Sequence, residues 1–195
     1  MIKPRTDRKM KVYKVVADVD AFQSIHVEDG SLWGAPMLEF DGTSKAAGWL
    51  PPEVYVLMPK LVKGNFYHLT PGAFVVDSVA CETLRSLFER CAELLPLPHE
   101  GETLQVVNVT QCINVLDKKR TEWEYGPRTG KPIRLVKHVF KPNRFIETPL
   151  FKIPETATAH IYTIEGQKDP EDEFKFNVES KGLKGLLFKE VWAEE

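Results

Sequence analysis

The stretch LQVVNVTQCINVLD, residues 104–117, begins as an apolar run and ends among polar, turn-forming residues. The valines of residues 104–109 are β-branched, and such a run favours a buried strand. Asn114 is typical of the turn that leaves this strand, because asparagine side chains bond readily to nearby backbone. Asn108 begins an N-x-T sequon, which has no meaning in a protein that is not exported. No motif assigns a base to Cys112, so we expect a small packed side chain there.

The clearest predicted helix lies upstream, over about residues 78–94, and is expected to pack on this strand. Its apolar residues follow the i, i+4, i+7, i+8, i+11 spacing of one buried stripe. The stripe consists of Ala80, Leu84, Leu87, Phe88 and Cys91. Asp77 or Ser78 is suited to cap the start of the helix. Pro96 and Pro98 forbid its continuation, because proline lacks the amide proton that a helix needs.

Further strands are predicted wherever β-rich or alternating residues occur. They cover residues 11–16, 54–58, 104–109, 133–140, 160–164, 174–178 and 182–192, with a short strand or turn at 149–153. Glycine and proline interrupt residues 17–52 repeatedly, and we expect aromatic residues there to pin loops over the core. Those aromatic residues are Trp33, Phe40 and Trp49.

One good helix among scattered strands predicts an α+β fold. We expect a mostly antiparallel or mixed β-sheet, with the amphipathic helix of about residues 78–94 packed on it. Residues 1–70 would supply N-terminal strands and aromatic-pinned loops of the same fold, and residues 71–195 the main α+β domain. The regular alternation of strand and helix that a doubly wound sheet requires is absent.

The composition is that of a globular protein, with 195 residues, 43% hydrophobic and 28% charged. The net charge of −2 gives no general attraction to nucleic acids or to anionic membranes. The start MIKPRTDRKMKVYKVV lacks the apolar region of a secretory signal, and no apolar run reaches the roughly 20 residues that span a bilayer. An odd number of cysteines then favours reduced thiols in the cytoplasm, and no membrane partner is expected.

Motifs of catalysis or metal binding are absent from the sequence. It contains no GxGxxG, Walker, HExxH or GxSxG pattern. The spacing of Cys81, Cys91 and Cys112 does not make a zinc site. His138 and His160 lie on predicted strands and could meet on one face, which is a weak metal signal. We therefore expect no catalytic residue, no metal and no cofactor. The alternative is a small enzyme that uses Cys112 or a histidine–carboxylate pair.

Two charged segments are candidate binding surfaces. Residues 118–144 are basic with interleaved aromatic residues, a mixture found in protein hot spots and in binders of single-stranded nucleic acid. The candidate partner-binding residues are Lys118, Lys119, Arg120, Trp123, Tyr125 and Arg128. The alternative acidic surface is Asp169, Glu171, Asp172 and Glu173. A plain hairpin with a solvated basic rim is the simpler interpretation of the basic segment, and the net charge counts against nucleic acid.

Several stretches together resemble a known family. They are ELLPL at 93–97, VVNVTQCINVLD at 106–117, FKIP at 151–154 and GLKGLLFKEVW at 182–192. They are similar to immunity-protein family eleven of bacterial polymorphic toxin systems, over about residues 71–192. A serine often follows the Val-Leu-Asp motif in that family, whereas Thr121 occupies this region here.

The resemblance implies a non-enzymatic cytoplasmic protein that binds and neutralises a cognate toxin domain without a cofactor. It transfers no catalytic residue and no toxin contact. The basic segment would suit an acidic toxin surface, whereas a nuclease toxin would call for an acidic face. The sequence leaves a homodimer open. Of the two surfaces, the basic segment is preferred, because tryptophan, tyrosine and arginine dominate hot spots.

Overall fold

The computed structural model describes residues 8–32 and 34–194, which form two α-helices, eleven β-strands and several short 3-10 helices. The helices are α1 (Ser78–Phe88) and α2 (Phe174–Ser180). The strands are β1 (Lys11–Ala17), β2 (Ser24–Val27), β3 (Val54–Leu57), β4 (Phe66–His68), β5 (Phe74–Val76), β6 (Ala92–His99), β7 (Glu102–Val109), β8 (Glu122–Tyr125), β9 (Pro132–Lys137), β10 (Ile161–Glu165) and β11 (Leu186–Ala193). All pairings between these strands are antiparallel, which confirms the predicted α+β fold.

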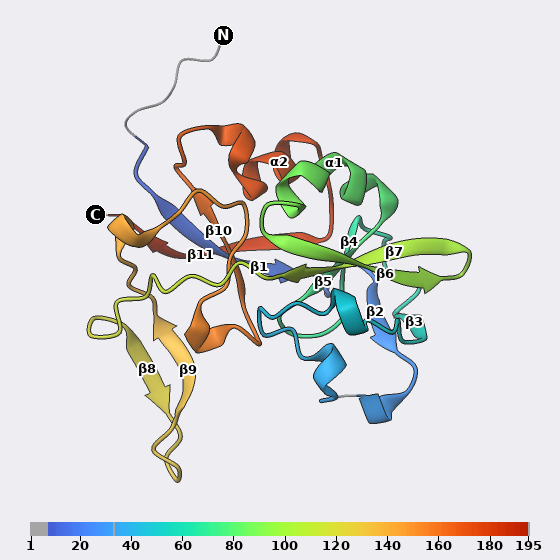
Figure 1. Ribbon diagram of the computed structural model, residues 1–195, viewed down its shortest axis with the longest axis horizontal. Coiled ribbons are helices and arrows are strands. Elements are labelled where there is room, and N and C mark those ends of the chain that lie inside the picture. The colour runs from blue at the N-terminus through green and yellow to red at the C-terminus, as the bar shows by residue number, and fades with distance from the viewer. Residues whose placement is uncertain (1–7, 33, 195) are drawn as a thin grey trace.

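The strands form two main sheets and two ribbons (Figure 1). One main sheet has the order β10-β1-β11, and the other has the order β4-β5-β7-β6. The ribbons are β2-β3 and β8-β9. The N-terminal strand β1 therefore pairs on both sides with strands from the C-terminal part of the chain.

Strand β7 explains why the opening stretch is apolar on both faces. It lies between β5 and β6 and is buried from both sides. Val107 and Val109 pack in the cluster that contains the buried stripe of α1. Leu104 and Val106 pack on the other side, in the cluster that contains Phe40. A strand covered on both faces needs apolar residues in succession, not in alternation.

Helix α1 begins as predicted and ends earlier than predicted. Asp77 caps it, because its Oδ1 accepts a hydrogen bond of 2.7 Å from the backbone N–H of Ala80. The helix ends at Phe88, and residues 92–99 form strand β6 instead of a last helical turn. Because β6 is an edge strand, Pro96 and Pro98 are tolerated in it without breaking the sheet.

The predicted strand at residues 174–178 is wrong, because this segment is helix α2. The alternation of Phe174, Phe176 and Val178 suggests a strand. The spacing of Phe174 and Val178 fits one helical face equally well, and these two are the buried ones. Phe176 is exposed. The rings of Phe174 and Phe88 lie 6.0 Å apart between centroids, which joins α2 to α1; the two helices lie side by side at the top of Figure 1.

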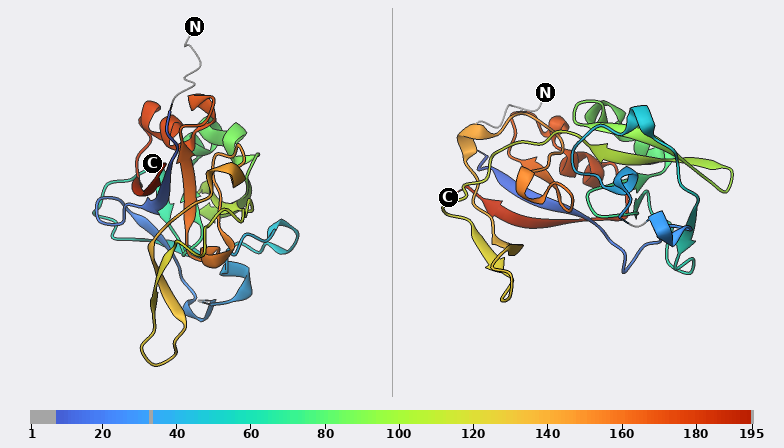
Figure 2. Two further views of the ribbon diagram at one scale, coloured as in Figure 1. Left: turned by 90° about the vertical axis from the view of Figure 1, so that its left-hand side faces the viewer. Right: turned by 60° about the horizontal axis from the view of Figure 1, so that its bottom comes forward.

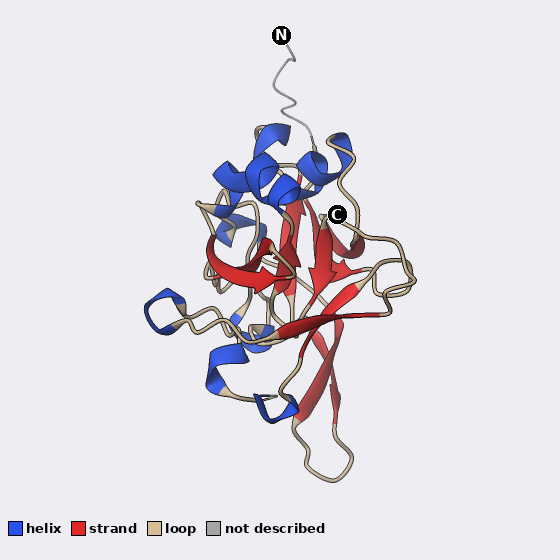
Figure 3. Cartoon of the chain, turned by 90° about the vertical axis from the view of Figure 1, so that its right-hand side faces the viewer, coloured by secondary structure: helices blue, strands red, loops and turns tan. Residues whose placement is uncertain are grey.

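The region between β1 and β3 is pinned by aromatic residues, as expected. Phe40 is fully buried, and its ring centroid lies 6.2 Å from that of Trp49. The indole N–H of Trp49 donates a 2.8 Å hydrogen bond to the backbone oxygen of Pro96 in β6. The third predicted anchor, Trp33, lies outside the described residues. Figure 3 shows these loops, with their short helices, on the opposite side of the strands from α1 and α2.

The sheet β10-β1-β11 is also packed on both faces. Val15 and Ile161 face the cluster that contains the α1 stripe and Phe174 of α2. Val12 and Tyr162 face a separate cluster built from residues 113–116, 135–140 and 151–153. This separate cluster supports the base of the β8–β9 ribbon and lies beside His138 and His160, the two histidines identified from the sequence.

Candidate functional site

The basic segment forms a hairpin that projects from the molecule. Strands β8 and β9 pair only with each other, and in both views of Figure 2 they extend away from the rest of the chain. Tyr125, Ile133 and Val136 are 56%, 61% and 54% exposed. Isolated two-stranded hairpins are marginally stable in water, so this ribbon depends on the contacts at its base.

Trp123 and Thr121 hold the base of the hairpin. Trp123 is half-buried, pairs in register with Leu135, and packs against the aromatic cluster of the body. Thr121 is buried, and its hydroxyl accepts a 3.3 Å bond from the N–H of Val139. Thr121 therefore has a structural role at the base of the hairpin.

The other predicted partner-binding residues lie at the surface. Lys118, Lys119 and Arg120 form the turn before β8, and Arg128 lies in the turn between β8 and β9. The Nζ of Lys118 is 2.7 Å from a carboxylate oxygen of Glu155, an ion pair back to the body. The other three basic residues and Tyr125 are exposed. Lys118, Lys119 and Arg120 therefore lie at the base of the hairpin, and Arg128 lies at its tip.

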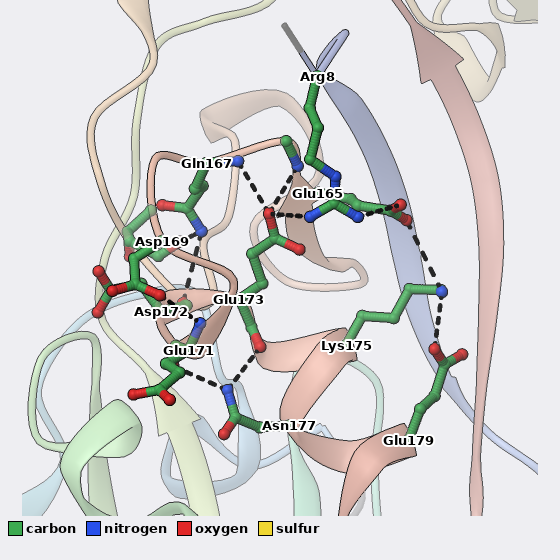
Figure 4. A network of polar contacts seen from close by, with 12 residues as sticks. Arg8, Glu165, Gln167, Asp169, Glu171, Asp172, Glu173, Lys175, Asn177 and Glu179 are labelled. Carbon is green, nitrogen blue, oxygen red and sulfur yellow. Dashed lines mark hydrogen bonds and ion pairs between the residues drawn. The ribbon is translucent and has the colours of Figure 1, made fainter. Parts of the chain in front are cut away.

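One of the four residues of the alternative acidic surface, Glu173, belongs to the interior (Figure 4). Glu173 is only 1% exposed, and one carboxylate oxygen accepts from the N–H groups of Gly166 and Gln167 at 2.7 and 2.9 Å. That oxygen also faces Arg8 at 3.5 Å. Burial raises the pKa of Glu173. Glu173 is therefore not a surface carboxylate, and its role is to organise the loop before α2.

The remaining acidic residues are only partly available. Asp172 forms an ion pair with Arg90, and Asp169 accepts a 3.0 Å bond from the N–H of Glu171. Asp169 and Glu171 are the exposed members of the predicted set. Two exposed carboxylates make a smaller charged face than the four that the sequence suggests.

Cys112 is exposed, so the expectation of a packed side chain there is wrong; partial burial still raises the pKa of its thiol. Cys81 and Cys91 are buried, and burial raises the pKa of Cys91 to about 12. A nucleophilic cysteine needs a lowered pKa, which none of these three has. Next to Cys112 across a β-bridge lies Lys152, a fully buried residue that the sequence gives no reason to notice.

His138 and His160 meet on one side chain, Tyr162. The hydroxyl of Tyr162 is 3.2 Å from Nε2 of His138, 3.2 Å from Nδ1 of His160 and 3.1 Å from Oγ1 of Thr156. Burial lowers the pKa of both histidines to about 4, so both are neutral at pH 7. Burial also raises the pKa of Tyr162 to about 12, which keeps its hydroxyl protonated.

A cavity of about 190 Å³ adjoins this histidine–tyrosine cluster. It lies where β1, the end of β4, the loop at residues 70–73 and the start of β10 converge. Its polar lining includes Lys14, His68, Thr70 and His160. Burial, followed by the charge of Lys189, lowers the pKa of Lys14. The sequence does not reveal this cavity, because its walls come from segments far apart in the chain.

No helix among the described residues is both long and apolar enough to cross a bilayer. Within residues 8–32 and 34–194, histidine, cysteine, aspartate and glutamate side chains do not gather in threes at any place suited to a metal ion. Comparison of the chain with protein-family models and with curated proteins finds no match.

Proposed function

We propose that this chain is a non-enzymatic immunity protein that binds and neutralises a cognate bacterial toxin domain. The observation that carries the proposal is the projecting β8–β9 hairpin, which exposes Tyr125, Ile133 and Val136 beside basic residues. Tyrosine and arginine dominate the energy of protein interfaces, and exposed apolar side chains gain most from being covered. The family resemblance supplies the kind of partner.

The proposed contact surface consists of the hairpin and the turn before it, and we call it the hairpin surface. Its members are Lys119, Arg120, Tyr125, Arg128, Ile133 and Val136. Its basic charge suits an acidic patch on the toxin, which would steer association and make it dependent on salt. The proposed location is the cytoplasm, where the three free cysteines would stay reduced.

Co-purification tests the partner. The full chain would be co-expressed with the C-terminal domain encoded by the gene immediately upstream, and the complex isolated through a tag on that domain. We expect a one-to-one complex. If the upstream gene encodes no such domain, or if the two proteins separate on a sizing column, the immunity proposal is wrong.

Calorimetry on the isolated proteins tests the surface. We expect Tyr125→Ala and Arg128→Ala each to weaken binding by about tenfold, because both side chains are exposed and both are of the hot-spot type. Trp123→Ala is a poorer test, since Trp123 also holds the hairpin to the body.

Tyr55→Ala is the matched control, because Tyr55 is an exposed tyrosine on the other two-stranded ribbon, β2-β3. It should leave the affinity unchanged. Equal affinities for the wild-type protein and both hairpin variants would move the binding surface elsewhere on the molecule.

A further inference from the structure

The cavity beside Tyr162 combines several basic groups with no acidic one in its described lining. Lys14, His68 and His160 contribute the titratable side chains, and the rest of the wall is apolar or neutral. A concave site with converging polar groups is the usual form of a small-ligand site. At neutral pH Lys14 is the one charged group in the described lining, and its positive charge beside two histidine rings favours a ligand of negative charge.

Lys14 enters this site from the central strand β1. It pairs in register with Tyr162 of β10 on one side and with Lys189 of β11 on the other. Directly opposed residues share one face of an antiparallel sheet, so two lysines lie side by side there. Like charges in this position repel each other. An anion bound beside Lys14 would offset that repulsion.

His160 lines the cavity and is neutral at pH 7, and its hydrogen-bond network can also hold the protonated ring. Its Nδ1 lies 3.2 Å from the hydroxyl of Tyr162, and its ring lines the cavity. A protonated His160 would donate from Nδ1 to the tyrosine oxygen. The tyrosine proton would then point to Nε2 of His138 or to the hydroxyl of Thr156. The network therefore accommodates the charged ring without losing a hydrogen bond.

His68 and the loop at residues 70–73 form the facing wall. The ring centroid of His68 lies 6.4 Å from that of His26, and both burial and His26 lower the pKa of His68. Gly72 allows this loop to approach residue 158 closely. A Cβ on Gly72 would lie 2.6 Å from the backbone oxygen of Phe40 and 2.8 Å from that of Thr158. The cavity is thus framed by tightly packed backbone.

We propose that this cavity binds a phosphate group, free or at the end of a small ligand, through Lys14, His68 and His160. Phosphate offers three strong acceptor oxygens and about two negative charges at neutral pH, and it can engage three donors at once. The site is separate from the hairpin surface, and it does not depend on the immunity proposal.

Calorimetric titration of the full-length protein with inorganic phosphate tests the proposal. We expect saturable binding that Lys14→Met and His160→Gln each weaken by at least about tenfold. Lys168→Gln, an exposed lysine outside the cavity, is the matched control and should bind as the wild-type protein does. Phosphoserine should also bind, which would show that the site accepts a phosphomonoester, and acetate should bind weakly.

Three outcomes would overturn the proposal: absence of phosphate binding by the wild-type protein, equal affinity for acetate, or unchanged phosphate affinity of both cavity variants. Circular dichroism would establish that each variant is folded. A second measurement requires no variant at all, because it follows the wild-type protein with sulfate, which keeps its two charges over the working range of pH.

The sulfate affinity should rise as the pH falls from about 7 toward about 4.5, because burial lowers the pKa of His160 to about 4 and the anion favours the protonated forms of His160 and His68. The charged or titratable groups around these rings are Lys14, Lys189, His26, His138, Tyr162 and Glu155. Burial also lowers the pKa of His138 to about 4, so its protonation acts in the same direction as that of His160. A sulfate affinity that does not change with pH would contradict the assignment of the histidines to the site.

Discussion

Lys152 has no exposed surface, and its Nζ donates to the backbone oxygen of Phe40, 112 residues upstream in the chain. Burial lowers the pKa of Lys152 to about 8 from an ordinary value of 10.5. The nearby Asp41 acts in the opposite direction and offsets part of this effect. A single buried amine therefore ties the loop after Phe40 to the strand segment at residues 151–153.

The lowered pKa of Lys152 predicts that the free energy of unfolding rises at alkaline pH. The folded pKa of Lys152 is lowered, so below about pH 8 the protein carries the full cost of a buried charge. Between about 8 and 10.5 the unfolded chain binds the proton and the folded chain does not, so the free energy of unfolding rises with pH. The gain is on the order of 3 kcal/mol.

Urea unfolding of the wild-type protein and of Lys152→Met, at a series of pH values, measures this contribution. The methionine does not titrate, so the difference in unfolding free energy should move in favour of the wild-type protein as the pH rises. A difference that stays constant over that range would show that Lys152 is already solvated or paired in the folded state.

At the level of single elements, the local spacing of apolar and capping residues predicts where a helix or strand begins better than where it ends. Asp77, the apolar stripe of α1 and the strand at β7 follow from patterns that are contiguous in sequence. The end of α1 and the existence of helix α2 do not follow from such contiguous patterns. Residues 92–99 satisfy the register of β7, and a seven-residue helix at 174–180 fits the same apolar residues as a strand. Tertiary pairing decides such ambiguous segments.

The cap of α1 gives a test at this scale. Asp77→Ala removes the acceptor of the Ala80 N–H and the partner of the Asn65 side chain, which donates to Asp77 at 2.9 Å. We expect a loss of about 1 kcal/mol in unfolding free energy, the usual cost of a missing N-cap. Ser78→Ala is the control, since Ser78 is exposed. Equal stabilities of the two variants in urea would remove Asp77 as the cap.

At the scale of the whole molecule, the two candidate sites depend on contacts between segments that lie far apart in the sequence. The cavity exists because β1 pairs with β10 and β11, and because the loop at residue 72 packs against residue 158. The sequence predicts that His138 and His160 could meet, and the structure adds the side chain at which they do, Tyr162. For Glu173 the sequence is misleading. Its acidic neighbours suggest a surface position, whereas its burial depends on contacts with Arg8 and residues 166–167.

Bacterial growth tests the proposed role of the hairpin surface most directly. The toxin domain encoded upstream would be induced in cells that carry the wild-type protein, the double variant Tyr125→Ala and Arg128→Ala, or the control Tyr55→Ala. We predict that the wild-type protein and Tyr55→Ala restore growth, while the double variant, expressed to the same level, does not. Growth restored equally by the double variant would show that the hairpin surface does not bind the toxin, and a lack of protection by the wild-type protein would show that it is not an immunity protein for that toxin.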